Sequence, residues 1–198
     1  GGMGIGISSW RLAQAVAKAG GIGVVSGAAI HIVIARRLQL GDPGGNLKRG
    51  FDAFPFKDVA RRVYDKYFIP RGKKTDVSFR DPERFSLQPG RLLIELVVVA
   101  NFVEVFLAKE GHAGMVGINY LEKIQMPHIF SLFGALLAGV DFVTVGAGIP
   151  SQFPSVMAGL AGGEAVEYRL DVTGAVPGEF VIRFDPADFF EEHAVPEI

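Results

Sequence analysis

The stretch "GMVGINYLEKIQMPHIFSLFGALLAGVDFVTVGAGIPSQFPSVMAGLAGG" (114–163) decides the fold class, because strand patterns and helical patterns alternate along it. Residues 114–124 begin as an apolar, β-branched strand, and residues 141–150 read as another that ends in glycines. Residues 128–140 and 153–163 have the spacing of helices. Strand, helix, strand, helix in this order predicts parallel strands with helical crossovers, and therefore an α/β fold.

The residues before this stretch continue the same pattern. Residues 22–27, "IGVVSG", predict a further short buried strand. Helical spacing is also found over residues 8–19, 29–40, 55–68 and 92–108. Ser8 or Ser9 is placed to cap the first of these helices, and glycines 20 and 21 end it. The polar residues 69–90 predict a surface excursion.

The most apolar segment, residues 92–108, raises the question of a membrane span. Glu95, Asn101 and Glu104 interrupt it. A carboxylate at bilayer depth costs about 2.5–3.5 kcal/mol, and this segment would carry two of them. We therefore expect a buried helix of an α/β protein, and no membrane partner.

Composition excludes several other classes of function. The formal net charge of −1 gives no electrostatic case for a nucleic-acid partner. The chain has no cysteine, and no pair of its histidines has the spacing of metal ligands, so we expect no metal site. The first residues lack the basic region and cleavage site of a signal peptide, which predicts a cytoplasmic protein.

Towards the end of the chain, "EYRLDV" (167–172) and "EFVIRFD" (179–185) alternate apolar and polar residues around a turn, which predicts a β-hairpin. We therefore divide the chain into an α/β part, residues 1–165, and a β-hairpin insertion, residues 166–198. The α/β part fits an open doubly wound sheet or a (β/α)8 barrel, and both bind ligands at the carboxyl ends of strands. Three strand ends with small or polar residues suit one ligand across a barrel mouth.

A barrel needs about 250 residues, and this chain of 198 supplies three good barrel strands. We therefore expect a partial (β/α)8 TIM barrel whose first strand and later strands are missing.

The glycines near the start do not form a dinucleotide loop. The pattern G-x-G-x-x-G would need a third glycine at Ile7 when counted from Gly2, or at Ser9 when counted from Gly4. What remains is a Gly-Met-Gly loop leaving a strand that lies upstream. Its glycines allow close approach of a flat ligand, and Met3 offers a polarisable side chain to pack on a ring. A plain glycine turn is the alternative.

Three segments together resemble the nitronate monooxygenase family, formerly called 2-nitropropane dioxygenases. They are "GGMGIGISSWRLAQAVAKAGGIGVVSG" (1–27), "FVEVFLAKEGHAGMVGINYLEKIQ" (102–125) and "LLAGVDFVTVGAGIP" (136–150). The resemblance covers roughly residues 1–165. It implies an FMN flavoprotein on a (β/α)8 barrel that oxidises nitronates or nitroalkanes with O2 to a carbonyl compound and nitrite. The resemblance is compatible with a homodimer but does not determine the oligomeric state.

The resemblance also implies roles for residues at the strand ends. Asn119 matches an asparagine that hydrogen-bonds the flavin in this family. The other cofactor-binding positions that the resemblance implies are Gly2, Met3, Gly4, Ser26, Gly27, Lys123, Gly146, Ala147 and Gly148.

The residues after Asn119 allow more than one interpretation. Lys123 could stabilise charge at the N1–C2=O edge of a reduced flavin, or could form a loop ion pair with Glu122. Gln125 and His128 are expected in the substrate pocket, Gln125 within reach of a ring carbonyl. The remaining histidines are expected to be structural or to lie outside the region of resemblance: His31, His112 and His193.

The chain departs from the family in two motifs. The family's catalytic histidine lies in a "GGH"-type segment, and its phosphate loops are rich in glycine; neither occurs in these residues. The resemblance therefore places the catalytic histidine beyond Ile198 and leaves the catalytic residue of this chain unknown. An FMN-dependent enoyl-acyl-carrier-protein reductase using NAD(P)H fits the same strand ends. A truncated, non-catalytic fragment that binds FMN weakly or not at all is the other alternative.

Overall fold

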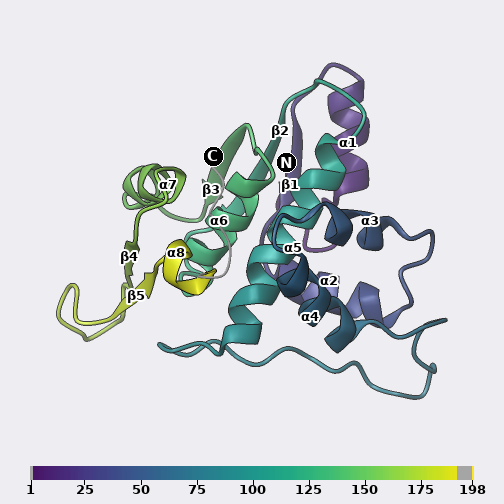
Figure 1. Cartoon of the computed structure of the whole chain (residues 1–198). Helices are drawn as coiled ribbons and strands as arrows, with labels where there is room; N and C mark the ends of the chain where they lie inside the picture. Colours follow the sequence, from purple (N-terminus) through teal and green to yellow (C-terminus); the bar gives the residue numbers. More distant parts are fainter. Residues whose placement is uncertain (1, 191–197) are drawn as a thin grey trace.

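The computed structural model describes residues 2–190 and 198. It confirms the α/β class: three parallel strands form one sheet in the order β1-β2-β3 (Figure 1). The strands are β1 (Gly23–Ser26), β2 (Val116–Leu121) and β3 (Phe142–Gly146), all within segments predicted as strands.

The helices follow the predicted order, with two additions. They are α1 (Trp10–Lys18), α2 (Ile30–Gln39), α3 (Asn46–Ala53), α4 (Lys57–Tyr67), α5 (Arg91–Lys109), α6 (His128–Leu137), α7 (Phe153–Ala161) and α8 (Pro186–Phe189). The sequence analysis missed α3 and α8. Helix α3 is polar and begins where Asp42 accepts the backbone N–H groups of Leu47 and Lys48, at 3.0 and 2.8 Å. The carboxylate thus acts as a cap from outside the helix.

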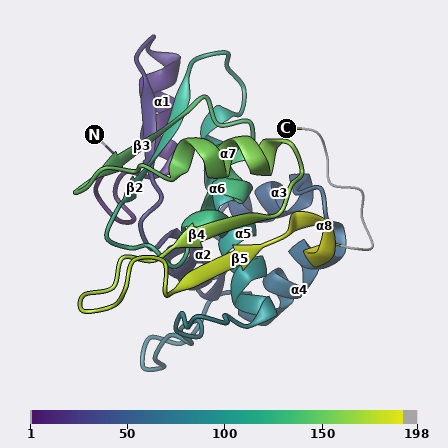
Figure 2. The ribbon, with the colours of Figure 1, turned by 90° about the vertical axis from the view of Figure 1, so that its left-hand side faces the viewer.

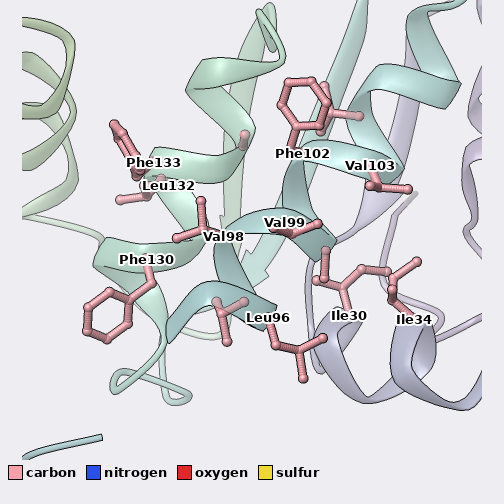
Figure 3. Close-up of a cluster of buried hydrophobic side chains, with 14 of the residues drawn as sticks. Ile30, Ile34, Leu96, Val98, Val99, Phe102, Val103, Phe130, Leu132 and Phe133 are labelled. Carbon is pink, nitrogen blue, oxygen red and sulfur yellow. The ribbon is translucent and has the colours of Figure 1, made fainter. Parts of the chain in front are cut away.

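Helix α5 is the centre of the core, packed between α6 and α2 (Figure 3). Its side chains Leu96, Val98 and Val99 are fully buried. The approach of α6 is close: a Cβ placed on Gly134 would lie 2.1 Å from the carbonyl oxygen of Val98. A glycine is therefore required where the two helix backbones meet.

The polar residues that interrupt the apolar run of α5 are buried and have partners, as the prediction of a buried helix requires. Glu95 pairs with Arg62 at 2.7 Å and with Arg91 at 3.2 Å. The amide of Asn101 donates to the carbonyl of Val97 at 2.8 Å. Among residues 2–190 and 198, no helix has the length and apolarity to cross a membrane.

The cap of α1 differs from the expected serine. Ser9 occupies the N-cap position, but its side chain makes no capping hydrogen bond. Instead Glu104 of α5 accepts the backbone N–H of Trp10 at 2.7 Å, and Arg37 Nη1 donates to the other oxygen of Glu104 at 3.1 Å. A buried carboxylate from a distant helix thus replaces the local cap, an arrangement that spacing along one segment does not reveal.

The predicted hairpin is present as β4 (Val166–Arg169) paired antiparallel with β5 (Val181–Phe184). In Figure 2 it lies in front of the central helices α5 and α6. One side of it is buried in the same core as the rest of the chain, through Tyr168, Ile182 and Phe184. The hairpin therefore packs on the α/β part.

The helices that contact the sheet lie on one of its faces. On that face, Tyr120 O–H donates to Asn101 Oδ1 of α5 at 2.9 Å and to the carbonyl of Ser131 on α6 at 3.0 Å. In Figure 2 the strands lie to the left and α5 and α6 to their right. Side chains alternate between the faces of a strand. The opposite side, called the open face below, carries Val24, Ser26, Gly117, Asn119, Leu121, Phe142, Thr144 and Gly146.

Candidate functional site

The carboxyl ends of the three strands meet at one edge of the sheet, and the segment around Met3 lies against this edge. A Cβ placed on Gly2 would lie 2.5 Å from Val24 Cγ1 and 3.1 Å from Asn119 Cβ. A Cβ placed on Gly146 would lie 3.2 Å from Met3 Cε. The structure therefore brings together Gly2, Met3, Asn119 and Gly146, which the sequence analysis assigned to one site.

Polar side chains from all three strands share the open face at this edge. Ser26 lies opposite Asn119 in the register, and Asn119 lies opposite Thr144. Ser26 is 2% exposed, and its Oγ has no hydrogen-bond partner among the described residues. A buried hydroxyl in this state costs about 1–3 kcal/mol, so it marks a place where a ligand atom would be stabilising.

Thr144 was missed by the sequence analysis. It lies two residues before Gly146, so strand alternation places it on the same face. Its hydroxyl donates to the carbonyl of Ile118 at 3.4 Å, a long hydrogen bond, and its side chain is exposed. Alternation counted back from the strand end was the signal that could have found it.

The backbone beyond β1 and β3 adopts an uncommon conformation at non-glycine residues. Ala29, after β1, has φ 52°, and Ala147, after β3, has φ 63°. Such left-handed alanines cost about 1–3 kcal/mol each and gather at functional sites. Next to Ala147, a Cβ on Gly148 would lie 2.6 Å from Glu122 Cγ, so the loops after β2 and β3 are in contact.

Of the predicted cofactor positions, Gly27 points away from the open face and Gly4 lies in a turn. Gly27 was expected to line it with Ser26, but a Cβ on Gly27 would lie 2.2 Å from Tyr120 Cε1, on the helix-covered side. Alternation along the strand explains the difference. Gly4 belongs to the turn before α1, where its carbonyl accepts Ser8 N–H at 2.8 Å.

Lys123 and Gln125 line a neighbouring groove of about 570 Å³ between the start of α2, residues 81–85 and residues 123–127. No ion pair joins Lys123 to Glu122 within the described part of the chain, so the alternative of a loop ion pair is not observed. Gln125 Oε1 accepts the N–H of Asp171 at 2.7 Å, a contact with the residues after β4.

His128 lies in the core, contrary to its predicted place in a substrate pocket. It is 2% exposed, and its ring packs edge-on against those of Phe153 and Tyr168, with ring centroids 4.9 and 5.2 Å apart. Its Nε2–H donates to the carbonyl of Leu121 at 3.0 Å, because a carbonyl can only accept. Burial lowers the pKa of His128 to about 4 and keeps the ring neutral at pH 7.

Of the other histidines, His112 has the predicted structural role, whereas His31 lies at a groove. His112 accepts Gly114 N–H at Nδ1 and donates to the carbonyl of Ala108, so it is satisfied locally. His31 is partly buried, with its pKa lowered to about 4 by burial, and it lines the groove. His193 lies outside the described residues. No cluster of metal-ligating side chains occurs in residues 2–190.

Comparison with known proteins identifies no family and no function for this chain. No protein-family model, no curated protein and no solved structure matches the chain.

Proposed function

We propose that the edge formed by β1, β2 and β3 binds the isoalloxazine ring of FMN, in a chain that forms part of a (β/α)8 barrel. The reaction proposed for the whole enzyme is oxidation of a small nitronate with O2 to a carbonyl compound and nitrite. The observation that carries the proposal is the register of Ser26, Asn119 and Thr144 on the open face, with Met3 lying against the same strand ends.

The architecture is compatible with this proposal. Parallel strands with their contacting helices on one face are the building pattern of a (β/α)8 barrel, in which ligands bind at the carboxyl ends. The open face corresponds to the interior of such a barrel.

The residues at the edge fit a flat, polar heterocycle. The hydroxyl of Ser26 is buried with no hydrogen-bond partner in the described part of the chain, and the Asn119 amide lies beside it in the register. Gly2 and Gly146 lie where a Cβ would collide or crowd, so the backbone runs close to the strands. The thioether of Met3, half-exposed, is suited to packing on an aromatic ring.

When bound, FMN supplies a two-electron acceptor that reacts with O2. The chain's own residues would hold it: the Asn119 amide and the Ser26 hydroxyl would hydrogen-bond it, and the Met3 thioether would pack on its ring. Gly146 and Gly148 allow the backbone to approach. Lys123 is left out of this set because it lines the neighbouring groove. None of the described histidines lies on the open face at this edge, so no residue is assigned to the proton transfer of the reaction.

Titration of the chain with FMN and with riboflavin tests the proposal. Because the edge holds only the ring, the two flavins should bind with about equal and weak affinity. Asn119→Ala should weaken both by about tenfold, the value of one or two lost hydrogen bonds. Asn46→Ala, on α3, is the matched control and should leave both unchanged. Flavin fluorescence quenching gives the affinities.

Ser26→Ala separates a ligand role from a structural one. Its hydroxyl has no hydrogen-bond partner among residues 2–190 and 198, so the variant should unfold at the same urea concentration as the wild type or a higher one. Flavin affinity should nevertheless fall. Absence of flavin binding, or equal binding by the Asn119→Ala and Asn46→Ala variants, would contradict the proposal.

An FMN-dependent enoyl reductase is the alternative on the same edge. Added propionate 3-nitronate should cause O2 consumption in a nitronate-oxidising enzyme that contains this chain. Oxidation of NADH with an enoyl thioester, in place of O2 consumption, would favour the reductase.

A further inference from the structure

The groove beside the candidate edge has the size and lining of a ligand site. Its volume of about 570 Å³ lies within the range of about 300–1,000 Å³ typical of small-molecule pockets. Its apolar lining comes from three separate segments of the chain: Ile32, Pro82, Phe85, Ile124, Met126 and Pro127.

The acidic side chains of the groove are already engaged within the protein. Asp81 accepts from Arg36 Nε at 3.1 Å and Nη2 at 2.9 Å. Glu83 accepts the backbone N–H of Gly90 at 3.2 Å. The charge of Asp81 is therefore offset by that of Arg36, and Glu83 is held by a backbone hydrogen bond.

The basic side chains of the groove are in a different state. Arg84 and Lys123 line it from different segments, and neither has an ion-pair partner within the described residues. His31, edge-on to Phe85 at 5.7 Å, contributes no positive charge at pH 7 because burial lowers its pKa to about 4. The groove thus combines an apolar lining with two cations available to an anion.

We propose that this groove binds an amphiphilic carboxylate, with its apolar chain on Ile32, Phe85 and Ile124 and its carboxylate paired with Arg84 and Lys123. Charge selects the carboxylate over a cationic amphiphile, since the acids of the groove have partners and the bases do not. The apolar lining selects a chain of several carbons over a small anion such as acetate. The site does not depend on flavin binding at the strand edge.

Calorimetric titration of the full chain with decanoate tests the proposal. We expect saturable binding at one site, with decanol and acetate each at least tenfold weaker. Arg84→Gln and Lys123→Gln should each weaken decanoate by about threefold, the value of an exposed charge pair, and more salt should weaken it further. Arg61→Gln, an equal loss of charge on α4, should have no effect. Ile124→Ser, at a position 41% exposed, should weaken decanoate with little effect on folding.

Three results would overturn the proposal: no saturable binding of decanoate, equal binding of decanol, or equal loss in the Arg61→Gln and Arg84→Gln variants. Arg84 and Lys123 are exposed, so their variants keep the fold, which circular dichroism verifies. Flavin is absent from the titration. Decanoate binding without any flavin affinity would support the groove while contradicting the proposed function, so the two failures are distinguishable.

Discussion

Glu104 is a single residue on which two helices depend. Its carboxylate is fully buried, accepts Trp10 N–H at the start of α1, and pairs with Arg37. Glu104→Ala should lower the free energy of unfolding by about 3 kcal/mol, because it leaves a buried N–H and a partly buried guanidinium without a partner. Glu104→Gln keeps an acceptor and should cost about half as much. Urea unfolding followed by Trp10 fluorescence, the chain's one tryptophan, measures both; equal losses would exclude the capping role.

His128 is a single residue that makes the free energy of unfolding depend on pH. Its pKa is about 4 in the folded chain, against an ordinary value of 6.5. Between these values the unfolded state binds more protons, so stability falls as pH falls through this window, by up to about 3 kcal/mol in total. His31 shifts in the same direction. The wild type loses stability between pH 7 and pH 4. In the His128→Gln variant this loss should be about half as large, as measured by urea unfolding at each pH. An unchanged loss would contradict a neutral, buried His128.

At the scale of elements, the contact between α5 and α6 depends on Gly134. A Cβ there would lie 2.1 Å from the Val98 carbonyl oxygen, and both helices are buried. Gly134→Ala should lower stability by about 3 kcal/mol, since neither backbone can retreat without disturbing the core. Gly162→Ala is the control: its Cβ would meet atoms at 3.5 Å and its φ is −78°, so stability should change by less than about 1 kcal/mol. Thermal unfolding compares the two.

Most elements could be predicted from the sequence because their signals are local. The alternation of apolar strands with helices of regular spacing gave β1, β2, β3 and the long helices. Helix α3 was missed because its cap, Asp42, precedes a Pro-Gly-Gly turn that predicts a break. The Glu104 cap and the Tyr120 contact of Gly27 were missed because both join segments distant in sequence. Strand ends therefore identified the candidate edge, whereas the direction of each side chain follows from alternation along the strand, which the sequence analysis did not apply.

At the scale of the whole molecule, the hairpin and the α/β part share one core. The ring of Phe184 on β5 packs edge-on against those of Phe130 and Phe133 on α6, with ring centroids 5.2 and 5.4 Å apart. Phe184→Ala should lower stability by about 3–5 kcal/mol. Trp10 lies on α1, outside the hairpin, so its fluorescence should report the same shifted transition as far-UV circular dichroism. A Trp10 transition unaffected by the substitution would mean that the hairpin unfolds as a separate unit.

Strand β2 has a consequence for protein engineering. Asn119 and Tyr120 are consecutive, yet one belongs to the open face and the other is anchored by Asn101 and the carbonyl of Ser131. Odd-numbered positions of this strand point to the open face, and even-numbered positions point to the face that the helices cover. A library at position 119 changes the open face while Tyr120 keeps its anchors on the other side of the strand; Gly117 must stay fixed, because a Cβ there would lie 2.2 Å from the ring of Phe142.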